Sequence, residues 1–193
     1  VPGPVPEGLT PRIKDTAIQL CKIYIALNVI EMLILWALGM SLFDSINHAM
    51  ATMATGGFST KNASIGAYSE AIQWVVIFFM FLAGTNFSLH SRFLKKDWFC
   101  YFRDTEFLVY IGIILFSSAF FMFLITVSGT NAINQVGESA PRDSVFTTMA
   151  ILTTTGFATV DFDQWPQAAR LLLLVLMFIG GSAGSTAGGM KII

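Results

Sequence analysis

The chain has 193 residues, of which 54% are hydrophobic and only 12% are charged, and its formal net charge is −1. A soluble domain usually carries about 25% charged residues, so this composition excludes an ordinary soluble domain and indicates a protein that faces lipid. Because a bilayer requires backbone groups to be hydrogen-bonded internally, we expect an all-α membrane protein. The charge balance gives no indication of a nucleic-acid partner.

The first half of the chain alternates long apolar stretches with shorter ones. Residues 1–15 are polar and rich in proline, which predicts a linker or surface strap. Residues 16–40 are long enough to cross a ~30 Å hydrocarbon core. Residues 41–54 are amphipathic and too short to span. A loop over residues 55–64 precedes a second predicted span over residues 71–90.

The second half repeats this order after a basic, aromatic and presumed cytoplasmic linker at residues 91–105. It is expected to contain a third span, a polar connection, a short amphipathic helix, a loop and a fourth span that becomes rich in glycine: residues 107–129, 130–142, 143–153, 154–163 and 166–193. We therefore expect two helix–pore loop–helix units, at residues 16–90 and 106–193, the second truncated in its last helix.

The two loops have nearly the same sequence. Residues 50–60 read Met-Ala-Thr-Met-Ala-Thr-Gly-Gly-Phe-Ser-Thr, and residues 149–159 read Met-Ala-Ile-Leu-Thr-Thr-Thr-Gly-Phe-Ala-Thr. An offset of 99 residues aligns Gly57 with Gly156. This offset contains two full spans and one re-entrant loop, so the two units are predicted to be parallel tandem repeats.

The distribution of Lys and Arg predicts the orientation. One set of helix ends holds Arg12, Lys14, Lys22, Arg92, Lys95, Lys96 and Arg103, and the opposite set holds only Lys61, Arg142 and Arg170. The positive-inside rule therefore predicts that residues 91–105 are cytoplasmic and that both Gly-Phe loops lie near the outer face.

A half-helix that enters the membrane and turns back leaves carbonyl groups without helical partners, so such backbone must be buried in protein or line a wet cavity. Rings of carbonyl oxygens from Thr- and Gly-containing loops form potassium filters in this way. Either loop alone could be an ordinary turn, but two copies in register favour a filter. Because a ring needs about four loops, this chain requires further repeats or a second chain.

The same motifs resemble the Trk/Ktr/HKT superfamily of potassium transporters, in particular its bacterial TrkH-type membrane subunits. The resemblance rests on residues 55–60, 84–90, 153–159 and 180–191 and covers essentially the whole chain. Members have four non-identical helix–pore loop–helix repeats, and this chain resembles the second and third. We therefore expect it to be an internal piece of a longer protein.

The resemblance implies potassium uptake across the bacterial inner membrane, with potassium as the transported substrate and no cofactor. It also implies a homodimer of complete subunits and a cytosolic ring of nucleotide-binding regulatory subunits. The implied filter residues, whose backbone carbonyls would coordinate potassium, are Ala54, Thr55, Gly56, Gly57, Thr153, Thr154, Thr155 and Gly156. The implied gate loop consists of Gly180, Gly181, Ser182, Ala183, Gly184, Ser185, Thr186, Ala187, Gly188, Gly189 and Lys191.

The run Gly180–Gly189 leaves three interpretations open. Gly180, Gly184 and Gly188 have the spacing of closely packed membrane helices. Ten residues without a large side chain form a poor helix, so a broken segment that lines the pore is a second interpretation. A phosphate-binding loop is the third, although Lys191 is not followed by Ser or Thr.

Four polar residues near the short helices also have alternative roles. Glu31 lies within a span, where it could make a structural hydrogen bond or line an ion pathway. Asp44 and Asp143 are in register and are expected to cap or anchor the short helices. His48 is expected to be a packing residue at the membrane interface.

The rival functional hypothesis is a membrane transporter or scaffold whose broken helices bind a small solute. Such proteins are often built from inverted repeats, whereas the repeats here are predicted to be parallel, which favours the pore. The sequence shows no nucleophile–base set and no metal-ligand cluster, so we do not expect an enzyme. Cys21 and Cys100 fit no metal or redox spacing.

Overall fold

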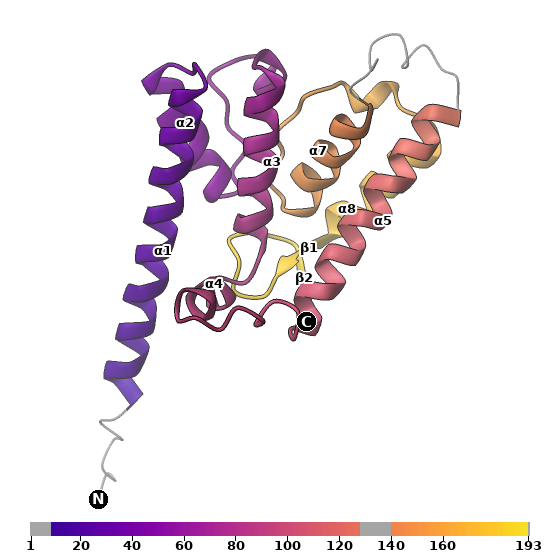
Figure 1. Ribbon diagram of the computed structural model, residues 1–193. Coiled ribbons are helices and arrows are strands. Elements are labelled where there is room, and N and C mark those ends of the chain that lie inside the picture. The colour runs from indigo at the N-terminus through magenta and orange to yellow at the C-terminus, as the bar shows by residue number, and fades with distance from the viewer. Residues whose placement is uncertain (1–8, 128–139, 193) are drawn as a thin grey trace, which may run out of the picture.

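The structure is a computed structural model that describes residues 9–127 and 140–192. Figure 1 shows a helical protein in which short helices alternate with longer ones, so the expected fold class is confirmed. The elements are α1 (Leu9–Ala37), α2 (Leu42–Met53), η1 (Ser64–Ala67), α3 (Glu70–Gly84), α4 (Phe87–Leu94), α5 (Thr105–Val127), α7 (Ala140–Leu152), η3 (Phe162–Gln164), α8 (Gln167–Phe178), β1 (Ile179–Ser182) and β2 (Met190–Ile192).

The first helix is longer than the sequence suggests. α1 begins at Leu9, so the prediction of a strap over residues 1–15 is wrong for residues 9–15. Pro11 lies in the first turn of α1, where the missing N–H would have had no helical partner, and it therefore does not prevent the helix from starting. The chain turns at Gly39, whose φ is 98°, and α2 follows.

The expected span at residues 71–90 is broken. α3 ends at Gly84 and α4 begins at Phe87, and the two helix axes differ in direction by 97°. Thr85 has an extended backbone, and the Oδ1 atom of Asn86 accepts a hydrogen bond from the N–H of Ser88 at 2.9 Å. An N-cap residue has non-helical backbone angles, so α3 ends before Asn86 and α4 begins after it.

The order of α1, α2 and α3 recurs in α5, α7 and α8. In Figure 1, α1 and α5 both run from the lower to the upper side of the molecule, and α2 and α7 both return toward its middle. Of the polar connection expected at residues 130–142, residues 130–139 lie outside the described residues and the last three belong to α7. The expected fourth span is a helix of only 12 residues, too short to cross a bilayer.

The protein core lies between α3, α5, α7 and α8, where the largest fully buried side chains include Met80, Tyr110, Phe121, Phe146 and Met149. The outer faces of α1 and α5 are apolar but exposed, as expected for helices that contact lipid, with Ile25, Trp36, Leu115, Phe116 and Phe123 on these faces. Among the described helices, α1 and α5 are long and apolar enough to span a membrane, and the bent pair α3–α4 is a third candidate.

Candidate functional site

The two Gly-Phe loops have the same unusual backbone. Thr55 and Thr154 have φ values of 50° and 57°, and Gly57 and Gly156 have φ values of 66° and 80°. A β-branched residue with positive φ is a true outlier, and such strain concentrates at functional sites. Gly56 lies between Thr55 and Gly57, and Thr155 lies between Thr154 and Gly156, and both have negative φ. This alternation of φ allows successive carbonyls to point to one side of the chain.

The amide groups of both loops are tied to the preceding short helix. The N–H of Gly57 donates to the carbonyl of Ala51 at 3.4 Å, and the N–H of Gly156 donates to the carbonyl of Ala150 at 2.9 Å. Within the described part of the chain, the carbonyls of residues 55–57 and 153–156 accept no hydrogen bond. These oxygens have no donor among the described residues and are therefore available as ligands.

The two loops meet directly. A Cβ atom built on Gly57 would lie 1.9 Å from the carbonyl oxygen of Thr155, a distance that no side chain could tolerate. Glycine at position 57 is therefore required both by its φ and by the close approach of the neighbouring loop. The structure thus brings the predicted filter residues of the two copies together at Gly57 and Thr155.

The Gly-rich run does not form a packed helix. Residues 179–182 and 190–192 form the short parallel strands β1 and β2, which the sequence did not suggest, and a loop joins them. The hydroxyl of Thr55 shares its proton between the carbonyls of Ala54, at 2.8 Å, and Thr186, at 3.0 Å. The N–H of Gly188 donates to Oγ1 of Thr154 at 2.7 Å. The run is therefore hydrogen-bonded to one threonine of each Gly-Phe loop.

The same loop docks into the break between α3 and α4. The carbonyl of Ala83, which the break frees, accepts hydrogen bonds from both the N–H and the Oγ1 of Thr186. The N–H of Phe87 in turn donates to the carbonyl of Gly184 at 3.1 Å. Glycine at position 181 is needed here, because a Cβ atom would lie 2.7 Å from the carbonyl oxygen of Gly84.

Two charged side chains, Glu106 and Lys191, bind backbone groups of the Gly-rich run. Glu106, at the start of α5, accepts a hydrogen bond from the N–H of Ala183. Lys191 donates to the carbonyl of Ala187 within the run itself. Glu106 was not among the predicted site residues, because it lies 77 residues before its partner and no sequence motif marks it.

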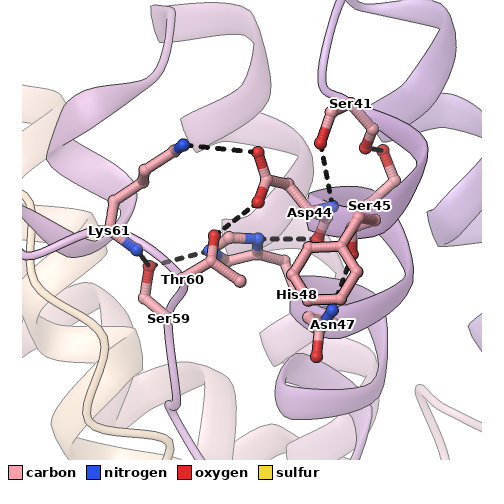
Figure 2. A network of polar contacts seen from close by, with 9 residues as sticks. Ser41, Asp44, Ser45, Asn47, His48, Ser59, Thr60 and Lys61 are labelled. Atoms are coloured by element: carbon pink, nitrogen blue, oxygen red, sulfur yellow. Dashed lines mark hydrogen bonds and ion pairs between the residues drawn. The ribbon is translucent and has the colours of Figure 1, made fainter.

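Asp44 and His48 link α2 to its own loop, as Figure 2 shows. The Oγ1 atom of Thr60 donates to Oδ1 of Asp44 at 2.6 Å, and the Nζ atom of Lys61 lies 3.6 Å from Oδ2. The helix is capped instead by Ser41, whose hydroxyl accepts the N–H of Asp44 at 3.1 Å, so capping by Asp44 was wrong. Asp44 lies outside the candidate spans, and the hydrogen bond from Thr60 lowers the pKa of its carboxyl.

His48 is more than a packing residue. Its Nδ1 atom lies 2.7 Å from the carbonyl oxygen of Asp44, and because a carbonyl only accepts, Nδ1 donates. In the neutral ring, Nε2 accepts from the hydroxyl of Ser59 at 2.8 Å. The ring also packs against Phe157 of the other loop, with centroids 6.0 Å apart. His48 therefore contacts both Gly-Phe loops.

The second copy repeats the carboxylate contact with a different cation. The Oγ1 atom of Thr159 donates to Oδ1 of Asp143 at 3.3 Å, and Nε of Arg142 lies 3.7 Å from the same oxygen. Arg142 also forms an ion pair with Glu70 at the start of α3. The two copies are thereby joined on the side of the loops that faces the start of α3.

Glu31 is fully buried on α1. Thr52 of the neighbouring helix α2 lies beside its carboxyl group. The hydroxyl of Thr52 donates to the carbonyl of His48, and neither carboxyl oxygen makes a hydrogen bond of ordinary geometry with a described residue. The structural role of Glu31 stays a prediction.

The comparisons with known proteins cover the whole chain. The family model described as "TrkH: Cation transport protein" matches residues 7–193. The chain is 38% identical to the Trk system potassium uptake proteins TrkH of Vibrio parahaemolyticus and of Escherichia coli K12, covering 100% of this chain and 40% of each relative. It is also 32% identical to an uncharacterised cation transporter of Methanocaldococcus jannaschii, of which it covers 37%.

The fold is similar to a solved structure as well. The crystal structure of the potassium transporter TrkH from Vibrio parahaemolyticus matches 96% of the chain with a TM-score of 0.86 and 38% identity. This chain spans 40% of the length of that structure. The expectation that the chain is not an enzyme is supported by these matches. With the family model matched over residues 7–193, the chain belongs to the TrkH family of cation transport proteins.

Proposed function

We propose that the chain supplies two quarters of a potassium-conducting pore, with the carbonyls of residues 54–57 and 153–156 as the potassium ligands. The observation that carries this proposal is the pair of loops whose amides are tied to short helices and whose backbones meet at Gly57 and Thr155. The carbonyls of residues 55–57 and 153–156 accept no hydrogen bond from the described residues, whereas that of Ala54 accepts one from the hydroxyl of Thr55. Carbonyl oxygens held in this way replace the water shell of a potassium ion.

The short helices add to the attraction for a cation. α2 and α7 both end at the loops, so their C-terminal ends are directed toward the site. The C-terminal end of a helix carries a partial negative charge of roughly half an elementary charge, which favours a cation without any carboxylate in the filter.

Packing around the loops supports the presence of further repeats in the complete protein. Phe157 is buried against His48 of the preceding copy, whereas the equivalent Phe58 is 81% exposed. Similarly, Gly57 contacts the loop of the following copy, whereas a Cβ atom on the equivalent Gly156 would meet nothing within 4 Å. Each copy thus has an unfilled contact on one side, which a first and a fourth repeat would complete.

The Gly-rich run is proposed to be the gate. It lies against the filter threonines Thr55 and Thr154 and is hydrogen-bonded to both. Each such contact is worth about 1 kcal/mol, so losing one of them shifts the run toward release without destroying its other contacts. Displacement would open the inner side of the filter.

The names of the relatives support potassium as the transported ion. The bacterial inner membrane is proposed as the site of action. A homodimer of complete subunits and a cytosolic nucleotide-binding ring remain part of the proposal. The rival hypothesis of a solute-binding transporter has less support. Figure 1 shows α1 and α5 running in the same direction, as in the parallel copies that a pore requires.

The test is potassium-dependent growth of an uptake-deficient bacterial strain that expresses the full-length protein. Rescue by the wild type, and its loss in both Gly57→Ser and Gly156→Ser at equal protein levels in the membrane, would support the proposal. Gly112→Ala in α5 is a matched control, because a Cβ atom there meets nothing within 4 Å. Normal uptake and selectivity in both serine variants would contradict the proposal.

A further inference from the structure

We infer that Asp44 and Asp143 are positioning residues that hold the outer half of each filter loop through Thr60 and Thr159, and that these two contacts maintain discrimination between potassium and sodium. This inference rests on the proposed pore function and adds residues that do not touch the ion. In each copy the aspartate lies in the first turns of the short helix and the threonine lies sixteen residues later, after the filter glycine.

The contact limits the freedom of the filter. The amide of Gly57 is fixed to α2, and the chain is held again at Ser59, by His48, and at Thr60, by Asp44. Three residues span at most about 10 Å, so holding Thr60 restricts where the carbonyl of Gly57 can point. Because Gly57 adopts both signs of φ with ease, its orientation depends on its neighbours and not on its own side chain.

The acceptors are suited to a lasting contact. Asp44 and Asp143 are only 8% and 1% exposed, so each carboxylate has lost most of its water and needs protein partners. A hydrogen bond to a charged group is also stronger than one between neutral groups. A carboxylate of this kind therefore holds its hydroxyl donor more firmly than a surface contact would.

The two copies share the hydrogen bond between aspartate and threonine but differ in the residues around it. The charge of Asp44 is balanced by Lys61, after the loop, whereas that of Asp143 is balanced by Arg142, before it. The contact between His48 and Ser59 has no counterpart, since Thr147 and Ala158 occupy the equivalent positions. The aspartate–threonine contact is thus the feature that both copies share.

The experiment measures the ratio of potassium to sodium uptake by the full-length protein in proteoliposomes. Thr60→Val and Thr159→Val remove the donor hydroxyl while keeping the shape of the side chain. Loss of a hydrogen bond to a charged group changes the equilibrium between the held and the released filter loop about tenfold or more. We therefore expect the ratio of potassium to sodium uptake to fall about tenfold.

Three variants serve as controls. Thr60→Ser and Thr159→Ser keep the hydroxyl and should restore the wild-type ratio. Thr126→Val removes a hydroxyl of the same kind on α5, where it donates to the carbonyl of Met122, and should leave the ratio unchanged. A role confined to stability would lower the amount of protein without changing the ratio, so protein in the membrane is quantified in every case.

The two copies provide independent tests. If Thr60→Val does not reach the membrane, Thr159→Val decides the question. A wild-type ratio in a valine variant that is correctly inserted, or an equal loss in the matching serine variant, would overturn the inference. A wild-type protein that transports no potassium would instead overturn the proposed function, so the two failures can be distinguished.

Discussion

Weakening the contact between the Gly-rich run and the filter should raise ion flux. The variant that tests this is Thr154→Val, which removes the acceptor of the Gly188 N–H, a hydrogen bond of 2.7 Å. Valine has the same β-branching as threonine, so the strain at a φ of 57° does not change. Any change in flux can therefore be assigned to the lost hydrogen bond.

The magnitude follows from the number of contacts. One neutral hydrogen bond contributes about 1 kcal/mol, which corresponds to a roughly fivefold change in an equilibrium constant. Thr55→Val removes the second contact, from its Oγ1 atom to the carbonyl of Thr186. If the two contacts act independently, the double variant should change the ratio of released to docked loop about thirtyfold.

The assay is rubidium uptake by full-length protein in proteoliposomes, with the potassium-to-sodium ratio measured in parallel. We expect flux to rise about fivefold in Thr154→Val and further in the double variant, while the ratio stays close to that of the wild type. Thr154→Ser keeps the hydroxyl and should show wild-type flux. Unchanged flux in Thr154→Val, with equal protein in the bilayer, would refute the reasoning.

Three other variants test neighbouring parts of the structure. Gly181→Ala places a Cβ atom 2.7 Å from the carbonyl oxygen of Gly84, so the run should be displaced and rubidium flux should rise. Gly84→Ala places one 2.3 Å from the hydroxyl of Tyr110 and should destabilise the protein by about 1–3 kcal/mol in thermal unfolding, whereas Gly112→Ala should not. Glu31→Leu removes a buried carboxyl whose oxygens lack a hydrogen bond from the described residues. It should raise the free energy of unfolding by about 1–3 kcal/mol, and with it the melting temperature, and leave uptake unchanged. A lower melting temperature in Glu31→Leu, or normal stability in Gly84→Ala, would contradict these assignments.

The sequence predicted the spans in α1 and α5, because apolar stretches of membrane length leave few alternatives in a bilayer, but it did not predict the break between α3 and α4 or the short length of α8. It also located the loops at residues 55–64 and 154–163, since a repeat at a fixed offset is visible without any structure. The break at Thr85 was missed because a short polar stretch, Thr85-Asn86, does not by itself show that a helix ends. What ends α3 is the cap provided by Asn86 and the docking of Thr186, which lies 103 residues after Ala83.

The contacts that fix the site were less predictable. Asp44 and Asp143 were recognised as a pair, but their partners Thr60 and Thr159 depend on how each loop folds back over its helix. Glu106 was missed because its partner is a backbone N–H, which has no sequence signature. Strands β1 and β2 were missed for a related reason, since glycine-rich segments have little strand propensity and their pairing depends on where the loop docks.

The most direct test of the central claim is to locate the ion itself. Crystals of the full-length protein grown in rubidium would show anomalous scattering at any site that dehydrated potassium occupies. The account predicts peaks between the two Gly-Phe loops, within coordination distance of carbonyls from residues 54–57 and 153–156. Peaks confined to other parts of the protein, in crystals of a transporter shown to take up rubidium, would contradict it.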